Sequence, residues 1–447
     1  MAGRSPLSRL TEWLTRPDHL PSNRARKRWH VSRPLLALLV AVGIVALALL
    51  FAQDQETLRI KSPLAAADPA FPDYVAALTG GGVTRGDEYE ILTNGVQILP
   101  AMLDAIRQAK HRISFESYIY DSGAVAADFT TALADAASRG VEVRLIVDAV
   151  GAGTMERSHA ERLEAAGVRI GTFNPLRWHS IEEINYRTHR KILVVDGEVG
   201  FTGGAGVADH WQGNADGPAH WRDTHFRVTG PAVTLLEACF YENWAETGHV
   251  SDARLDLRPP PPETRARSIV AWSSPSGGSN GVKLLYLLAL GAARRSIDLQ
   301  SPYVVLDEST RWSLLEARRR GVRVRVLVEG DLTDAKPVKY ASRADYEQLL
   351  AAGIEIHEYQ PTMMHVKALV VDGIWSVMGS ANFDNRSLEL NDEITVAVAH
   401  AGVAARLTDD FEADLRRSTT LRPDAWRARP VSDKMRERFW GLFGELF

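Results

Sequence analysis

The sequence has almost no cysteine, and this absence narrows both the fold and the chemistry. Cys239 is the single cysteine among 447 residues, so the chain cannot form a disulfide within itself. No group of cysteine and histidine residues has the spacing of a zinc site. A hydrophobic share of 45% in a chain of this length instead predicts a globular protein with room for two core-forming units.

The chain after residue 34 also lacks an excess of basic residues over acidic ones. Residues 1–34 carry a net charge of +6 while the whole chain carries −4, which leaves −10 for the remainder. Proteins that bind nucleic acid place Lys and Arg against the phosphates and usually have a basic surface. The charge balance therefore disfavours a nucleic acid as partner and favours a lipid.

One long apolar run is present, and it lies near the N-terminus. Residues 35–52, LLALLVAVGIVALALLFA, are uncharged and reach the lower limit for a membrane span. We expect a basic cytoplasmic segment over 1–34, a transmembrane anchor over 35–52 and a catalytic part on the extracytoplasmic side of a bacterial-type inner membrane. A cleaved signal peptide is the alternative, although the end of the run lacks a small-x-small cleavage site.

Two segments of the chain repeat one pattern. Residues 186–206 read YRTHRKILVVDGEVGFTGGAG, and residues 363–382 read MMHVKALVVDGIWSVMGSAN. Each contains His-x-Lys-x4-Asp, formed by His189, Lys191 and Asp196 in the first and by His365, Lys367 and Asp372 in the second. Asp-Gly between two apolar runs predicts a β-hairpin with a two-residue turn in each segment.

The hairpin assignment predicts where the motif side chains point. His189 and Lys191 are two residues apart on a strand, so they lie on one face, roughly 6 to 7 Å from each other. With Asp-Gly as the turn, Val195 pairs with Glu198 and Val371 with Ile374. The same count places Gly204 opposite His189 and Ser380 opposite His365. Both motif aspartates then lie at the hairpin tips, as turn and salt-bridge residues rather than proton carriers.

The segments around the two hairpins also repeat. SRGVEVRLIVDAV (138–150) matches RRRGVRVRVLVEG (318–330), and LEAAGVRIGTF (163–173) matches LLAAGIEIHEY (349–359). A period of about 180 residues indicates a duplicated domain, and alternating helical and strand patterns indicate an α/β sheet covered by helices. The expected divisions are a stalk or lead-in over 53–85, a first lobe over 86–255, a proline-rich linker over 256–266, a second lobe over 267–418 and a tail over 419–447.

For the tail, two interpretations remain open. MRERFWGLFGELF (435–447) fits an interfacial membrane helix, and it fits equally a helix that docks onto the protein's own core. The histidines and tryptophans near the first motif are open in the same way, since they fit a lipid or acceptor pocket as well as ordinary packing. They are His179, His210, His220, His225, Trp178, Trp211 and Trp221.

The two His-x-Lys-x4-Asp motifs, with Gly-Ser-Ala-Asn (379–382) after the second, resemble those of the phospholipase D superfamily. FESYIYDSG (115–123) and WRDTHFRVTGPAV (221–233) are similar to segments of bacterial cardiolipin synthases, and the likeness runs from about residue 95 to about residue 415. The resemblance implies two duplicated lobes, each a mixed sheet flanked by helices, with one active site at their pseudo-twofold interface.

The resemblance also implies a set of site residues. The six motif residues form the catalytic set, Ser380 and Asn382 contact the phosphate, and an acid orients each imidazole. Asp223 lies downstream of His189, and Glu393 lies in the parallel place downstream of His365. The first motif departs from the pattern, because Gly204 and Gly206 stand where the second has Ser380 and Asn382; backbone N–H groups can still bind a phosphate oxygen at Gly204.

Phosphodiester cleavage needs cations on the non-bridging oxygens, a nucleophile on one side and a proton donor on the other. Two histidines can fill both roles near neutral pH, and neither a metal nor a cofactor is required. The resemblance implies a phosphohistidine intermediate, with His189 as nucleophile and His365 as acid, although the symmetry of the motifs allows the reverse.

The predicted function is that of a cardiolipin synthase-like phosphatidyltransferase, which moves a phosphatidyl group between phosphatidylglycerol molecules or to another alcohol. Hydrolysis of a phospholipid or of single-stranded nucleic acid is the alternative within the superfamily. A degenerate binding module is a third hypothesis, but it would be expected to have lost a motif His or Lys, and all four are present. The oligomeric state does not follow from the sequence.

Overall fold

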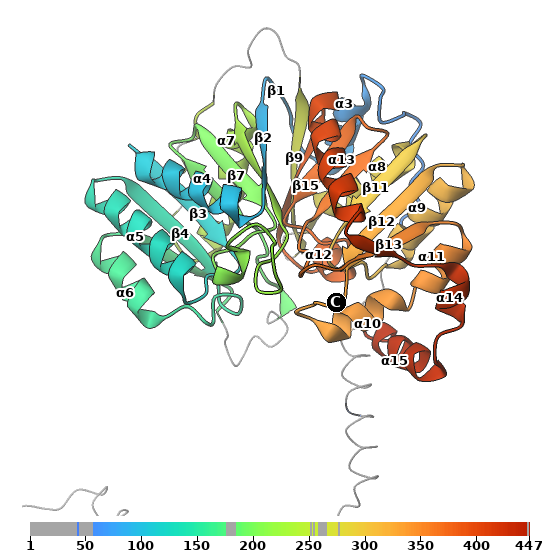
Figure 1. Cartoon of the computed structure of the whole chain (residues 1–447). Helices are drawn as coiled ribbons and strands as arrows, with labels where there is room; N and C mark the ends of the chain where they lie inside the picture. The colour runs from blue at the N-terminus through green and yellow to red at the C-terminus, as the bar shows by residue number, and fades with distance from the viewer. Residues whose placement is uncertain are drawn as a thin grey trace, which may run out of the picture. The chain divides into compact units, whose positions relative to one another are not determined.

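Two β-sheets form the framework of the protein in the structure, which is a computed structural model (Figure 1). It describes residues 43, 57–175, 185–250, 253, 255–257, 266–275, 278–444 and 447. Asp54–Phe447 form one compact unit, and every contact discussed below lies within it. The predicted basic segment (1–34) and anchor (35–52) lie outside the described residues, apart from Gly43. Within the described part of the chain, no helix is both long enough and apolar enough to cross a membrane.

The first lobe is built on a sheet with the strand order β2-β8-β7-β6-β3-β4-β5. Strands β3, β4 and β5 are parallel to one another, and the other neighbours are antiparallel, so the sheet is mixed. The strands are β2 (Glu88–Thr93), β3 (Arg112–Ser117), β4 (Glu142–Asp148), β5 (Arg169–Phe173), β6 (Ile192–Val195), β7 (Val199–Gly203) and β8 (Thr224–Thr229). The helices are α4 (Gly95–Gln108), α5 (Ala124–Ser138), α6 (Arg157–Ala165) and α7 (Ala232–Glu246), with a short 3-10 turn at Asp209–Trp211.

The second lobe repeats this order in a larger sheet, β1-β9-β16-β15-β14-β11-β12-β13-β17, in which β10 also pairs with β9. The strands are β1 (Val83–Arg85), β9 (Arg267–Ser274), β10 (Ser279–Asn280), β11 (Ser296–Gln300), β12 (Arg323–Glu329), β13 (Glu355–Tyr359), β14 (Ala368–Val371), β15 (Trp375–Gly379), β16 (Glu393–Ala399) and β17 (Ser418–Thr420). The helices are α3 (Phe71–Thr79), α8 (Gly281–Ala292), α9 (Glu308–Arg319), α10 (Lys336–Arg343), α11 (Tyr346–Ala351), α12 (Asn385–Glu389), α13 (Ala401–Leu415), α14 (Pro423–Arg427) and α15 (Val431–Gly441).

The shared order β8-β7-β6-β3-β4-β5 and β16-β15-β14-β11-β12-β13 makes the lobes copies of one α/β design, as the repeats predict. Alternate residues of the central strands face opposite sides. In β6, Leu193 and Val195 pack under α4 and α5, whereas Ile192 and Val194 face the other lobe. Ile192 and Val194 share an apolar cluster with Val396 and Val398 of β16. The two sheets thus bury a common core between them, and this core sets the lobes side by side.

The division into lobes differs from the prediction at the N-terminal end. Residues 57–85 are not a separate stalk. β1 pairs with β9 of the second lobe, and α3 packs on the same sheet, with the Phe71 ring 4.8 Å from that of Trp375. The reason is apolar burial, since Phe71 and Val75 are fully buried there. In chain order, residues 57–85 therefore belong to the second lobe and precede the first lobe.

The tail (419–447) docks onto the protein where the structure describes it. α14 places Trp426 in the second-lobe core, and α15 lies along α10. Glu437 of α15 accepts hydrogen bonds from Arg429 at 2.5 and 2.8 Å. One face of α15 nevertheless remains open to solvent, with Met435, Phe439 and Leu442 exposed. The tail therefore docks onto the second lobe and also keeps an apolar face of α15 exposed to solvent.

Candidate active site

Both predicted hairpins are present, with a register that differs from the prediction by one residue. Asp196 and Gly197 have φ of 55° and 68°, and Glu198 N donates to Val195 O at 3.0 Å, which makes the expected two-residue turn. The ladder, however, begins with Val195 opposite Val199, and with Val371 opposite Trp375 in the second lobe. An extra residue follows each turn as a bulge, so the pairing of Val195 with Glu198 is wrong.

The register shift changes the role of Gly204. It does not lie opposite His189. A Cβ on Gly204 would sit 2.3 Å from Asp223 Oδ1 and 2.7 Å from the backbone oxygen of His365. Glycine here lets the second lobe approach the first, which is a packing reason for the departure from the Ser380 pattern. A Cβ on Gly206 would likewise meet Trp211 and the Ile119 carbonyl, each at 3.1 Å.

The two motif aspartates bind backbone at the hairpin tips, as predicted. The Asp196 carboxylate accepts from the N–H groups of residues 110, 111 and 112 at 2.9, 2.7 and 2.9 Å. Asp372 accepts from residues 294, 295 and 296 at 2.9, 2.7 and 2.9 Å. These bonds tie each hairpin to the start of the neighbouring strand, β3 or β11. The carboxylates therefore act on the framework of the site rather than on a reacting group.

The acids that orient the imidazoles come from the opposite lobes. His189 Nδ1 lies 2.8 Å from Glu393 Oε1, and His365 Nδ1 lies 2.9 Å from Asp223 Oδ2. Backbone bonds support the crossing, since His189 N donates to Asp392 O and His365 N donates to Arg222 O, both at 2.8 Å. The order along the chain had placed each acid downstream of the histidine of its own lobe. The structure exchanges them, so each imidazole depends on both lobes.

Burial determines the protonation of the four catalytic candidates. It lowers the pKa of His189 to about 4, against the opposing effect of Glu393. Burial, together with Lys367 and Lys191, holds the pKa of His365 well below its ordinary value. Burial also lowers the pKa of Lys191 to about 7 and that of Lys367 to about 8. Both imidazoles are therefore neutral in the free protein at neutral pH, and the two lysines lose their protons near neutral pH.

The lysines lie against the histidines. Lys191 Nζ donates to His189 O at 2.9 Å, and Lys367 Nζ donates to His365 O at 2.9 Å and lies 3.0 Å from His365 Nε2. Both histidines line one cavity of about 310 Å³. The predicted convergence of the two motifs is therefore present. A tetrahedral anion in this cavity would meet an imidazole of each lobe.

The predicted phosphate-binding pair divides into two roles. Ser380 Oγ donates to Glu393 Oε2 and accepts from Ile394 N at 3.0 Å, so its hydroxyl supports the acid that holds His189. Asn382 lines the cavity, and its buried Oδ1 has no hydrogen-bond partner among the described residues. Asn382 is thus placed to meet a ligand, whereas Ser380 is placed behind the site.

Aromatic side chains surround the imidazoles; the sequence offered Trp211 and Trp221 for a pocket or for ordinary packing, and it did not single out Tyr118. Trp211 and Trp221 lie 5.4 and 5.3 Å from the His365 ring, and Trp211 Nε1 donates to Asp223 at 2.9 Å. The Tyr118 ring lies 5.2 Å from that of His189. Of the predicted aromatic group, His210 joins this cluster, His220 pairs with Asp216, His225 is buried behind it, and Trp178 and His179 lie outside the described residues.

Further cavity residues were also missed, among them Arg187, Tyr303, Asp334 and Arg386. Tyr303 and Asp334 follow β11 and β12, which are parallel neighbours. Residues just beyond the carboxyl ends of parallel strands are the usual ligand-binding positions in α/β sheets. That rule, applied to the repeated segment 318–330, was the signal in the sequence that pointed to Asp334.

Comparisons with known proteins agree with this geometry. A family model described as "Cardiolipin synthase, PLD-like domain" matches residues 102–212 and 286–415. Cardiolipin synthase 1 of Bacillus anthracis is 34% identical over 401 residues, which cover 87% of this chain and 78% of that protein. Cardiolipin synthase of Geobacillus thermodenitrificans is 35% identical over 368 residues, which cover 81% and 73%.

Solved structures share the fold at low sequence identity. Phosphatidylserine synthase of Haemophilus influenzae aligns with a TM-score of 0.64 at 11% identity, over 84% of this chain and 99% of that one. Polyphosphate kinase of Porphyromonas gingivalis aligns with a TM-score of 0.50 at 15% identity, over 87% and 57%.

Two copies of one α/β lobe that each bring a histidine to a shared cavity, with a lysine beside each histidine, define a phospholipase D-like enzyme. Within that class, the chain belongs to the cardiolipin synthase family, as the two sequence motifs predict. The family consists of enzymes that transfer phosphatidyl groups or cleave phosphodiesters.

Proposed function

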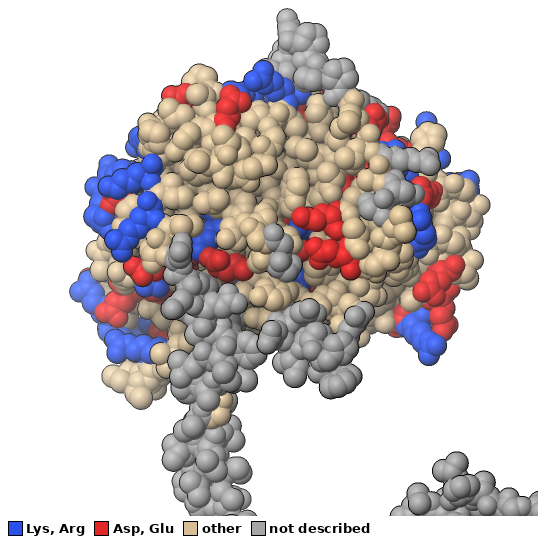
Figure 2. All heavy atoms as spheres, turned by 180° about the vertical axis from the view of Figure 1, so that it is seen from behind, with Lys and Arg blue, Asp and Glu red and all other residues tan. Residues whose placement is uncertain are grey.

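We propose that the protein transfers a phosphatidyl group from one phosphatidylglycerol molecule to a hydroxyl of a second, with release of glycerol. The observation that carries the proposal is the placement of His189 and His365, one from each lobe, in the wall of one cavity. The names of the relatives indicate the product, and the net charge of −10 after residue 34 agrees with a lipid rather than a nucleic acid as substrate. On the face shown in Figure 2, visible basic and acidic side chains are interspersed, without one continuous basic tract.

In the first step, His189 Nε2 attacks phosphorus and the bond from phosphorus to the glycerol oxygen breaks. His365 Nε2 gives its proton to that oxygen, so glycerol leaves neutral. A bound phosphodiester places a negative charge beside His365, which favours its protonated form, so His365 takes up a proton from solvent as the substrate binds. Lys191 and Asn382 line the cavity and Lys367 lies beside His365 Nε2, so these three groups can bind the non-bridging oxygens, where charge must be balanced.

In the second step, the acceptor hydroxyl gives its proton to His365 and its oxygen attacks the phosphorus of the phosphohistidine. The bond to His189 breaks, and the free imidazole is restored. Protons balance over the cycle, since the proton that His365 takes from the acceptor hydroxyl replaces the one that it gave to the leaving glycerol. No other group needs to change its protonation state.

The choice of His189 as nucleophile follows from the acids behind the imidazoles. Burial acts to raise the pKa of Glu393, but His189 and Lys191 hold it below its ordinary value, so this carboxylate is charged. Burial raises the pKa of Asp223 despite Lys367. The positively charged ring of a phosphohistidine is stabilised by a carboxylate that stays ionised. Glu393 is more readily ionised than Asp223, which favours the covalent bond on His189.

The assignment of His189 as nucleophile and His365 as acid can be tested with a substrate whose leaving group departs without being protonated. With phosphatidyl-p-nitrophenol, His365→Ala should still release a burst of nitrophenol and retain label on the peptide that contains His189, because nitrophenolate leaves without a proton. His189→Ala should give no burst, and His220→Ala, which changes a histidine outside the cavity, should behave as the unchanged protein. Label on the His365 peptide instead would reverse the two roles.

Product analysis tests the reaction itself. Detergent-solubilised protein incubated with labelled phosphatidylglycerol should release glycerol and form a four-chain lipid. Phosphatidic acid as the sole lipid product would mean that water is the acceptor and the enzyme is a hydrolase. No turnover of any lipid would overturn both lipid functions and leave single-stranded nucleic acid to be tried.

We also propose that residues 35–52 anchor the protein in the inner membrane with the catalytic part outside the cytoplasm. The apolar run and the charge of residues 1–34 support this. Cys239 is buried, so it offers no background in a labelling test. A cysteine introduced at Glu161, whose side chain is 64% exposed, should react with an impermeant maleimide in cells with a permeable outer envelope, while one at Ser5 should not. The reverse pattern would invert the topology.

A further inference from the structure

Two of the cavity residues that the proposed chemistry does not use bind each other. Tyr303 comes from the loop after β11, and Asp334 comes from the loop between β12 and α10. Both line the cavity that holds His189 and His365. The Tyr303 hydroxyl donates a hydrogen bond to Asp334 Oδ1. They form an acid and hydroxyl pair in the wall of a phosphodiester site.

A carboxylate is the wrong charge for a cavity that receives a phosphodiester. Within the part of the chain that the structure describes, no Lys, Arg or His forms an ion pair with Asp334. The other acid of the cavity, Asp384, has a structural reason, since it accepts from Ser387 N at 2.8 Å at the start of α12. Asp334 acts on Lys367, where its charge opposes the lowering of the lysine pKa, so it lies within electrostatic reach of the catalytic centre.

The pair offers acceptors to a ligand that carries hydroxyl groups. Burial, and then Asp334, raise the pKa of Tyr303 well above its ordinary value, so the phenol keeps its proton and donates a hydrogen bond to the Asp334 carboxylate. The remaining lone pairs of Asp334 and the lone pair of the Tyr303 oxygen can accept hydrogen bonds. A carboxylate repels phosphate oxygens and accepts from alcohol O–H groups. A vicinal diol next to a phosphate matches this chemistry.

We propose that Asp334 and Tyr303 form the subsite that binds the glycerol hydroxyls of the phosphatidylglycerol head group. The inference rests on the proposed transfer reaction and names how its alcohol is selected. The leaving glycerol and the incoming glycerol occupy the same side of phosphorus in the two steps, so one subsite serves both. Bound through its second hydroxyl, the acceptor outcompetes water, which would otherwise turn transfer into hydrolysis.

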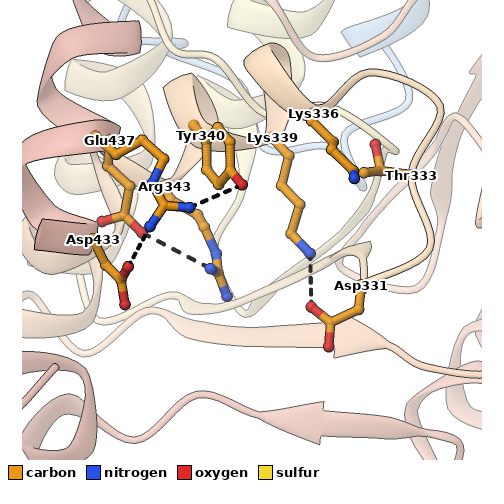
Figure 3. Close-up of a pocket in the computed structure, with 9 residues that line it drawn as sticks. Asp331, Thr333, Lys336, Lys339, Tyr340, Arg343, Asp433 and Glu437 are labelled. Carbon is orange, nitrogen blue, oxygen red and sulfur yellow. Dashed lines mark hydrogen bonds and ion pairs between the residues drawn. The ribbon is translucent and has the colours of Figure 1, made fainter. Parts of the chain in front are cut away.

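The loop that carries Asp334 is held in place from behind. Lys339 Nζ donates to Gly330 O at 2.5 Å and to Asp331 at 3.1 Å, and Ala335 N donates to Thr333 Oγ1 at 3.1 Å. Figure 3 shows this side, a pocket of about 210 Å³ between α10 and α15. Arg436 there reaches Tyr340 at 3.2 Å and Asp433 at 2.6 Å. The Lys339 bonds hold the loop to α10, and the bond from Arg436 to Tyr340 holds α10 to α15, so the pocket of Figure 3 has a structural explanation and the loop of Asp334 is supported from behind.

The test measures how the phosphatidyl group divides among acceptors. Purified full-length protein receives labelled phosphatidylglycerol in detergent with 1-butanol as a competing alcohol that lacks a second hydroxyl. Asp334→Ala should lower the ratio of the four-chain lipid to phosphatidic acid by about tenfold, the value of one good hydrogen bond, and should lower the ratio to phosphatidylbutanol similarly. Tyr303→Phe should shift both ratios in the same direction by a smaller factor.

Asp331→Ala is the matched control, because Asp331 lies in the same loop, pairs with Lys339 and lines the other pocket. Its product ratios should equal those of the unchanged protein. Equal losses of all three products in Asp334→Ala and Tyr303→Phe, with unchanged ratios, would overturn the subsite and leave a structural role. A wild-type protein that makes no four-chain lipid would instead refute the proposed transfer itself, so the two failures are distinct.

Discussion

At the scale of single residues, the site depends on contacts that cross between the lobes. Glu393 of the second lobe holds His189 of the first, and Asp223 of the first holds His365 of the second. Neither lobe contains a complete pair of imidazole and acid. The four catalytic side chains are also buried, so their charges are set by the protein rather than by water.

This burial gives a pH prediction. The pKa values of Lys191 and Lys367 are lowered to about 7 and about 8, so both ammonium groups are present below these values and are lost as the pH rises through them. The profile of kcat/KM, which reports the free enzyme, should therefore begin to fall near pH 7, instead of near the ordinary lysine value of about 10.4. An alkaline limb beyond pH 10 would mean that the lysines are solvated, contrary to their burial.

At the scale of elements, the hairpins show which features the sequence specifies. Asp-Gly between two valine-rich runs was enough to predict both hairpins and the tip positions of Asp196 and Asp372. The pairing register of the two strands could not be predicted in the same way, because the residue types at Glu198 and Ile374 do not indicate a bulge. A shift of one residue moves every partner across the strand, which is why Gly204 was assigned to the wrong histidine.

The tip contacts predict a stability effect that is separate from the chemistry. Asp196→Ala leaves three N–H groups of residues 110–112 without their acceptor, and we expect a loss of about 1 to 3 kcal/mol in the free energy of unfolding. Turnover per folded molecule should stay within about threefold. Urea unfolding measures the first and active-site titration the second. Asp104→Ala, which removes a surface ion pair with Arg107, should cost less than about 1 kcal/mol, and an equal cost for both would refute the role of Asp196.

Helix α15 carries a second prediction at this scale. Met435, Phe439 and Leu442 are 67%, 46% and 74% exposed and recur on one face of the helix, which suits contact with a lipid surface. Met435→Ser with Leu442→Ser should raise KM severalfold for phosphatidylglycerol in vesicles and leave activity on detergent-dispersed lipid unchanged. Val250→Ser, at a position 85% exposed elsewhere, is the control. Equal activity of both variants on vesicles would exclude α15 from lipid contact.

At the scale of the whole molecule, the duplication could be predicted from the sequence. The contacts by which each lobe contributes residues to the other could not. Repeated motifs in RGVEVRLIVDAV and RGVRVRVLVEG follow from strands buried in two equivalent sheets. Residues 57–85 gave no such signal, because a three-residue strand and one short helix have little periodicity. Their attachment to the second lobe depends on tertiary packing of Phe71 against Trp375. The exchange of Asp223 and Glu393 between lobes also depends on tertiary structure, as do the loop positions of Tyr303 and Asp334.

The central claim is that one phosphorus atom is bound between imidazoles of two different lobes. Orthovanadate adopts the five-coordinate geometry of phosphoryl transfer, so a crystal structure of the protein soaked with it tests the claim directly. We expect a single vanadium atom bonded to His189 Nε2, with His365 Nε2 within hydrogen-bond distance of the opposite apical oxygen. Two vanadate ions, each bound by the histidine and lysine of one lobe alone, would contradict it.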